Sequence, residues 1–251
     1  MHKIRLFSSG LVLMFILLLA ASPSQAAPMK TNLFGLDGLF MATGGTVVPA
    51  GELAVGGSGL ILTDDNGDIT TVPVTVTYGA SAKVEVAAAF EMYKSVDFGG
   101  GNDDTGTGDL YLAVKYALQE ENADYPATAV GLRLKLPMAD DPLSSEETDV
   151  AVFSAFEMEM KSIRGLLNVE YLMPGGDAEN QVIYVVGVEI PYSDTTDFTL
   201  EIMDQSLVGD LFAAGATFDM GSSLNFGVAV GFGLNDPSAD VATMGKLTFT
   251  F

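Results

Sequence analysis

The last seven residues of the chain alternate strictly between apolar and polar side chains. In the segment 245–251, Lys246 precedes Leu247, and single Thr residues separate Leu247, Phe249 and Phe251. Successive side chains of a β-strand point to opposite faces, so these three apolar residues would share one face. Because chain termini usually fray into solvent, a strand that ends on an aromatic residue has to be held to its last atom.

This ending resembles the C-terminal signal of Gram-negative outer-membrane β-barrels. In those proteins a terminal Phe follows alternating apolar residues and is recognised by the barrel-assembly machinery. The resemblance implies that Leu247, Phe249 and Phe251 form a C-terminal assembly signal.

The opposite end has the pattern of a secretory signal peptide. Lys3 and Arg5 precede an apolar run, and Ser24 and Ala26 are small residues at the positions that a signal peptidase recognises. The apolar run is shorter than the ~20 residues of a membrane-spanning helix. We therefore predict that residues 1–26 are cleaved. The absence of Cys excludes a lipoprotein anchor and disulfides.

The charge balance is strongly acidic. The predicted signal peptide contains two of the 11 basic residues and none of the 33 acidic ones, which leaves a formal charge of −24. Such a charge argues against a nucleic-acid partner, which would need a basic face. The chain is also 48% hydrophobic, and an acidic chain can be this apolar if its acids lie in loops and its apolar residues in strands.

Twelve segments show strand periodicity, and each is close to the ~9–11 residues with which a tilted strand crosses an outer membrane. The sequence therefore predicts an all-β fold, a transmembrane up-and-down antiparallel β-barrel of about 12 strands over residues 51–251. Residues 27–50 would form an N-terminal segment in the periplasm or in the lumen. The predicted strands are 52–62, 72–78, 83–93, 109–116, 127–136, 149–160, 164–172, 181–190, 197–203, 211–220, 224–233 and 241–251.

Short turns alternate with longer loops rich in Gly and Asp, as a membrane barrel with both termini on one side requires. The longer loops include 63–71, 95–108 and 139–148. Asp64, Asp65 and Asp68 faintly resemble a calcium loop, but the bidentate Glu is absent, so we predict no metal site. The acidic loops would exchange divalent cations with neighbouring lipopolysaccharide or serve solubility alone.

One face of each predicted strand is apolar and would contact lipid, whereas the other is mixed and would face the lumen. The same alternation places Tyr93 inward. Small inward residues such as Ala87, Gly187 and Gly227 would leave room for water or for the N-terminal segment. The predicted lumen charge cluster comprises Lys83, Glu85, Glu91, Lys115, Arg133, Lys135, Glu157, Glu159, Arg164 and Glu170.

Two interpretations of this cluster remain open. Opposite charges on neighbouring strands lie within reach of one another, so the cluster could be an ion-pair network that braces the wall. Alternatively, it could be a charged constriction that selects solutes.

The sequence lacks most of the residue combinations that enzymes use for catalysis. The only histidine is His2, inside the predicted signal peptide, so the mature chain would contain neither His nor Cys. Ser/His/Asp and Cys/His nucleophilic mechanisms and the usual zinc sites are therefore excluded. We predict no enzymatic activity and no cofactor.

The segment 106–116, which opens with Gly-Thr-Gly-Asp and ends in Lys-Tyr, is followed by a strand at 126–137 that closes on Lys-Leu-Pro. These segments and the preceding hairpin at 76–85 resemble the outer-membrane family named for the MetA pathway of phenol degradation. The family's usual Pro-x-Gly after that strand is absent. The resemblance implies a barrel of this size that passes small or aromatic compounds.

The sequence thus predicts a channel of the cell outer membrane for small solutes. Its other partners would be outer-membrane lipid, lipopolysaccharide and the barrel-assembly machinery. The alternative is a structural or surface-interaction barrel whose lumen is filled by side chains. An enzyme is the third hypothesis.

Overall fold

The computed structural model describes residues 28–65, 67–97, 103–139, 143–205, 209–236 and 239–251. The predicted signal peptide lies outside the described residues, and so do Asp140 and Asp141 of one acidic loop. Within the described part of the chain, no helix is long and apolar enough to cross a membrane.

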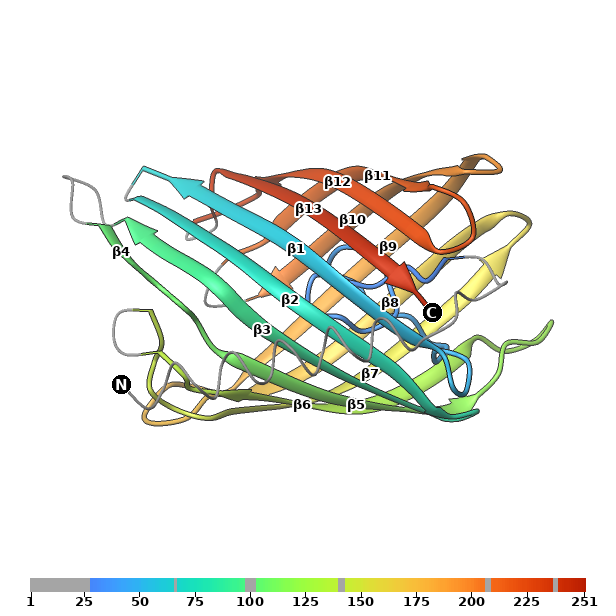
Figure 1. The fold of residues 1–251 in the computed structure, drawn as a ribbon, viewed down its shortest axis with the longest axis horizontal. Helices are drawn as coiled ribbons and strands as arrows, with labels where there is room; N and C mark the ends of the chain where they lie inside the picture. The colour runs from blue at the N-terminus through green and yellow to red at the C-terminus, as the bar shows by residue number, and fades with distance from the viewer. Residues whose placement is uncertain (1–27, 66, 98–102, 140–142, 206–208, 237–238) are drawn as a thin grey trace.

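The described residues form thirteen β-strands (Figure 1). Their bounds are β1 Leu53–Asp64, β2 Gly67–Ser81, β3 Val84–Asp97, β4 Asp103–Gly106, β5 Leu110–Gln119, β6 Ala127–Leu136, β7 Asp149–Met160, β8 Ile163–Met173, β9 Gln181–Ser193, β10 Thr196–Gln205, β11 Leu211–Asp219, β12 Leu224–Gly233 and β13 Val241–Thr250.

Every strand pairs antiparallel with its neighbours, and β1 pairs with β13 to close the sheet. The short β4 and the longer β5 both pair with β3, at successive positions along it. They therefore act as one wall strand, interrupted at 107–109, and the wall contains twelve strands. The predicted up-and-down antiparallel barrel of about 12 strands is confirmed.

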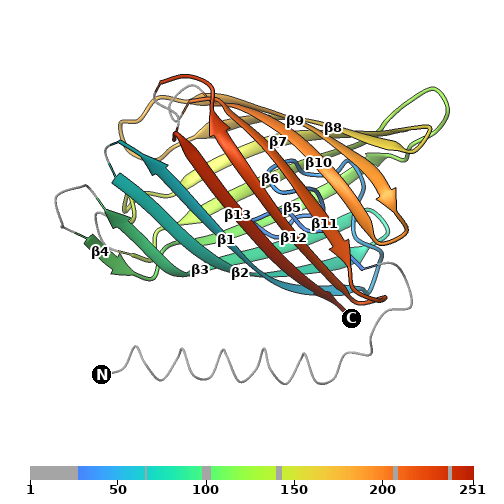
Figure 2. The same cartoon turned by 90° about the horizontal axis from the view of Figure 1, so that it is seen from above.

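The chain terminus and the short turns lie at one end of the barrel, which we call the terminal end. The longer connections lie at the opposite end, the loop end (Figures 1 and 2). The first hairpin differs from expectation, because β1 and β2 continue through most of the predicted 63–71 loop. Ile69 pairs with Leu62 and Asp68 pairs with Thr63, and strand pairing continues to Asp64 and Gly67.

Side chains alternate across the wall. On β9, Tyr184 and Val186 are 45% and 47% exposed, whereas Val185 between them is 7% exposed. An apolar outward face is what a lipid environment requires. The prediction that Tyr93 faces inward is wrong: the register of β3 against β2 shifts between Glu91 and Tyr93, and this bulge turns Tyr93 outward.

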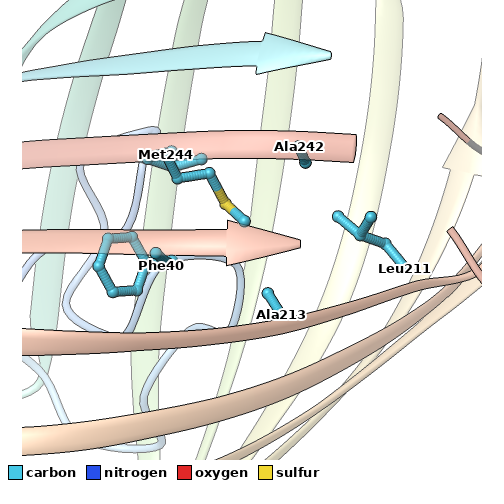
Figure 3. Packing of buried hydrophobic residues seen from close by; sticks show 7 residues of the cluster. Phe40, Leu211, Ala213, Ala242 and Met244 are labelled. Atoms are coloured by element: carbon cyan, nitrogen blue, oxygen red, sulfur yellow. The ribbon is translucent and has the colours of Figure 1, made fainter. Parts of the chain in front are cut away.

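The chain before β1 lies inside the barrel, where it appears as the blue loops between the strands (Figures 1 and 2). We call residues 28–50 the plug. Leu39 and Phe40 of the plug are fully buried. Phe40 packs with Leu211, Met244 and small wall residues (Figure 3), so the core of this protein lies between the plug and the wall.

The C-terminal residue takes part in barrel closure. The backbone N–H of Phe251 donates to the carbonyl oxygen of Leu53 at 2.8 Å, and the N–H of Leu53 donates to the carbonyl oxygen of Phe251 at 3.2 Å. This pair extends the β1–β13 seam by one step.

We predict that deletion of Phe251 lowers the folded, heat-modifiable fraction of the protein without stopping its secretion. The deletion removes both the seam bonds and the predicted assembly signal. Phe232→Ala is the control, because Phe232 is an outward Phe at the loop end, 51% exposed. Electrophoresis of unheated membrane fractions measures the folded band. Normal folding of the deletion would contradict the assembly-signal prediction.

Candidate functional site

The plug is an irregular segment with little secondary structure of its own. Two isolated bridges, Thr31 with Asp37 and Gly38 with Thr43, fold it back on itself. The side-chain oxygen of Asn32 accepts hydrogen bonds from the backbone N–H groups of Phe34 and Leu36 at 3.0 and 3.1 Å. Such a segment leaves many backbone groups without a partner inside the plug, and when buried they must find one elsewhere.

The most concentrated anchor of the plug is Glu201, on β10. Its carboxylate accepts hydrogen bonds from three consecutive backbone N–H groups, those of Phe40, Met41 and Ala42, at 2.9, 2.8 and 2.8 Å. Glu201 is 2% exposed. Bonds to a charged acceptor are stronger than those between neutral groups, so this carboxylate fixes one turn of the plug against the wall.

Neutral side chains of the wall form hydrogen bonds with other backbone groups of the plug. Asn168 accepts from the N–H of Thr43 and donates to its carbonyl oxygen, both at 2.6 Å. The hydroxyl of Ser58 donates to the carbonyl oxygen of Leu33 at 2.8 Å. Thr250 accepts from the N–H of Met29 at 2.8 Å. The contacts come from β1, β8 and β13, so the plug is held from several sides.

A buried ion pair joins two neighbouring strands beneath the plug. Lys115 Nζ lies 3.1 Å from Glu85 Oε2, and neither side chain is exposed. Glu85 also accepts from the backbone N–H groups of Asp37 and Val48 at 2.9 and 3.0 Å. Lys115 therefore neutralises a carboxylate that in turn holds two points of the plug.

Arg164 forms the centre of a second ionic group. Its Nε donates to Glu157 at 2.7 Å, and its terminal nitrogens lie 3.7 Å from Asp37 and 4.0 Å from Glu189. Glu157 also accepts from the backbone N–H of Gly45 at 2.9 Å. A plug carboxylate and two wall carboxylates thus share one guanidinium, which links the plug to β7, β8 and β9.

Lys30 brings a plug cation to the same region. Its ammonium lies 2.5 Å from Asp197 and 3.2 Å from Glu189. Burial alone would lower the pKa of Lys30, but Glu189 and Asp197 offset this and raise the pKa above the ordinary lysine value. Lys30 therefore stays charged and attached to the wall at physiological pH.

Lys246, on β13, binds the plug through carbonyl groups. Its ammonium donates to the carbonyl oxygens of Thr31 and Leu39 at 2.8 and 2.9 Å. It also lies 4.7 Å from the centre of the Phe40 ring, a cation–π contact. The plug thus receives both donors and acceptors from the wall.

Glycines on the inner wall make room for the plug. A Cβ added to Gly187 would lie 2.9 Å from Leu39, and one added to Gly227 would lie 2.9 Å from the Phe40 ring. A Cβ on Gly215 would lie 2.6 Å from Ala229 and 3.0 Å from the same ring. Larger side chains at these positions would therefore displace the plug.

Between the plug and the loop end lies a cavity of about 450 Å³, which we call the vestibule. Phe34, Phe40 and Met41 of the plug contribute to its lining. The wall residues that line it are Leu60, Leu62, Tyr111, Arg133, Lys135, Asp149, Ala151, Phe153, Asn168, Glu170, Leu172, Ile183, Val185, Met203, Gln205, Leu211 and Met244.

The vestibule has an apolar side and a charged side. Residues of β1, β10, β11 and β13 supply Leu and Met, whereas β5 to β8 supply the ionisable groups. Arg133 forms an ion pair with Glu170 and lies over the ring of Phe34. Lys135 lies 2.7 Å from Asp149 and 3.9 Å from Asp109. Both cations that line the vestibule are thus paired.

The structure divides the predicted lumen charge cluster into three groups. Glu85, Lys115, Glu157 and Arg164 hold the plug, and Arg133, Lys135 and Glu170 line the vestibule. Glu91 lies inward but apart, where it accepts from the N–H of Asp109 at 2.9 Å and from Thr71 at 3.0 Å.

Lys83 and Glu159 do not belong to the lumen. Lys83 lies in the exposed turn between β2 and β3, and Glu159 is exposed near the terminal end of β7. Both side chains are exposed at the terminal end, so they take no part in the buried charge cluster. Glu159 is nevertheless still in register with Arg164 in the β7–β8 pairing.

Asp37 and Lys30 are contributors that the predicted cluster lacks. They lie in the segment 27–50, for which the sequence left a periplasmic or a lumenal position open. The alternation of Gly and large apolar residues in 33–40 was an available signal that this segment packs against something. Among the described residues, no group of three or more His, Cys, Asp or Glu side chains could hold a metal ion.

Solved structures with a similar fold include the COG4313 outer membrane channel from Pseudomonas putida F1. It aligns with a TM-score of 0.66 at 13% identity, over 82% of this chain and 97% of that chain. The KdgM porin in complex with disordered oligogalacturonate aligns with a TM-score of 0.55 at 5% identity, over 80% of this chain and 99% of that chain. Identities this low show a shared fold. No protein-family model and no curated protein match the chain.

One of these neighbours is a channel and the other a porin, and what this chain shares with them is the barrel fold. The resemblance to the MetA-pathway family has no matching family model, so membership of that family stays a prediction.

We predict that Lys115→Met destabilises the barrel by about 3 kcal/mol, because it leaves the buried Glu85 carboxylate without a counter-charge. Lys83→Met is the matched control, since Lys83 is exposed in a turn of the adjoining hairpin. Urea unfolding of the protein in lipid vesicles gives both free energies of unfolding. An equal effect of the two substitutions would mean that the ion pair contributes nothing to stability.

Proposed function

We propose that this protein is a channel of the cell outer membrane for small solutes, and that the plug sets its conductance. The observation that carries the proposal is the vestibule, a cavity of about 450 Å³ between the loop end and the plug. A barrel that served only as a scaffold would have no reason to keep such a space. The shared fold with an outer-membrane channel and a porin supports the same function.

In this proposal a solute enters at the loop end, stays in the vestibule and passes when the plug shifts. The polar attachments of the plug are hydrogen bonds and ion pairs, which water can replace one by one. The resemblance to the MetA-pathway family favours small organic or aromatic compounds as solutes. The ion pairs of Lys115 and Arg164 hold the plug in this proposal, and the solute undergoes no chemical transformation.

The second candidate function is a structural or surface-interaction barrel with a filled lumen. The attachment of the plug from β1, β3, β8, β10 and β13 favours it. Under either function, we propose that the mature chain begins after residue 26, is inserted by the barrel-assembly machinery and contacts lipopolysaccharide through its acidic loops.

We predict that Glu201→Gln increases the conductance of the protein in a planar bilayer. The substitution removes the charge that three plug N–H groups share, and bonds to a charged group contribute about 1.5–3 kcal/mol each. A loss of about 1.4 kcal/mol would raise the population of detached plug roughly tenfold.

Glu159→Gln is the control for this measurement, because Glu159 is exposed and outside the lumen. Unchanged conductance in the Glu201 variant would contradict the proposal that the plug sets the conductance. Absence of conductance in the wild type and in both variants would favour the structural barrel.

We predict a weak cation preference at low ionic strength that fades at high ionic strength. Acidic loop residues concentrate cations at the mouth, and their field is screened over ~30 Å at 0.01 M salt but over ~3 Å at 1 M. Reversal potentials across a salt gradient measure the preference. Anion preference would instead assign selectivity to Arg133 and Lys135, the two cations that line the vestibule. The described loop-end acids include Asp64, Asp65, Asp68, Asp103, Asp104, Glu146 and Glu147.

A further inference from the structure

The charges that line the vestibule cancel one another. Arg133 is paired with Glu170, and Lys135 is paired with Asp149, so two cations face two anions. A charged solute would find no unmatched opposite charge there, and it would lose part of its hydration on entry. The lining therefore disfavours both anions and cations.

The same ion pairs still offer hydrogen bonds. Among the described residues, Arg133 donates to Glu170 through Nη2 alone, and a guanidinium has five N–H donors. Arg133 lies on the cavity lining with a quarter of its side chain exposed. A carboxylate that accepts from Arg133 retains further acceptor capacity, so Glu170 and Arg133 together can bind a group that both donates and accepts.

The opposite side of the vestibule is apolar and adaptable. Leu62 and Leu211 provide a hydrocarbon surface, and Met41, Met203 and Met244 add side chains with three rotatable bonds. Methionine side chains adjust to bodies of different shape, so this side selects for apolar surface in general. The lining thus has one position for a polar head and a larger surface for an apolar body.

We infer that the vestibule is a binding site for uncharged, mostly apolar organic molecules that carry one hydroxyl or carbonyl group. The polar head binds at the Arg133–Glu170 pair, and the body lies against the Leu and Met side. This inference rests on the proposed channel function and adds its substrate class. The acidic loops set which ions gather at the mouth, whereas the vestibule sets which molecules are retained.

The test measures binding to the full mature protein in lipid nanodiscs, with empty nanodiscs as the correction for partition into lipid. Four probes share one aromatic body: benzyl alcohol, toluene, benzoate and benzylamine. Ligand-observed NMR titration gives each dissociation constant at neutral pH. We expect benzyl alcohol to bind about tenfold or more tightly than each of the others, a difference of about 1.4 kcal/mol.

Two variants locate the site. Arg133→Met combined with Glu170→Met removes the head-binding pair without changing the net charge, and it should abolish the advantage of benzyl alcohol over toluene. Met203→Gln places an amide on the apolar side at nearly constant volume and should weaken both probes. Met160→Gln is its control, because Met160 is 56% exposed at the terminal end of β7.

Tighter binding of benzoate or benzylamine would overturn the inference in favour of an ionic site. Saturable binding of none of the probes would overturn it as well. Conductance separates the two proposals: a conducting protein that binds no probe keeps the channel and loses the site, whereas binding without conductance keeps the site and loses the channel.

Discussion

The burial of an irregular backbone inside the barrel is the constraint on which the rest of the structure depends. Each buried N–H or C=O of the plug needs a partner, because an unpaired one costs free energy comparable to a lost hydrogen bond. The wall supplies these partners from its inward side chains. Glu201 alone satisfies three N–H groups, and Lys246 satisfies two carbonyls. The inward charges of this barrel are therefore occupied by its own chain.

The size of the inward wall side chains decides how closely the plug approaches the wall and where a cavity remains. Gly187, Gly215 and Gly227 allow Leu39 and Phe40 to approach the wall, so the plug fills the lumen at its own level. Toward the loop end the wall carries larger apolar side chains, which contact the plug but do not fill the remaining volume. The vestibule results from this change in size along the lumen, together with the ion pairs that keep the charged side chains against β5 to β8.

The period of two in the sequence was enough to predict twelve strands, their faces and the closeness of Glu85 to Lys115. It failed where that period ends or slips: a bulge turned Tyr93 outward, and Lys83 and Glu159 lie at strand ends. The plug contacts could not be predicted, because no local pattern specifies a partner such as Glu201, which lies 161 residues from Phe40. Long-range contacts of an irregular segment depend on the completed barrel, and the divided lining of the vestibule depends on the plug.

The two sets of charges in this protein act over different distances. Loop acids are exposed, so they act as a screened field at the mouth and exert little force on a molecule once it is inside. Lumen charges lie close to partners of opposite sign, so their field is short-ranged and they act mainly as donors and acceptors. An ion that the loops attract finds no unmatched charge in the vestibule. Beyond the vestibule it reaches the plug, which is itself held by ion pairs. Attraction at the mouth and retention in the lumen are thus separate properties, set by different residues, and each can change without the other.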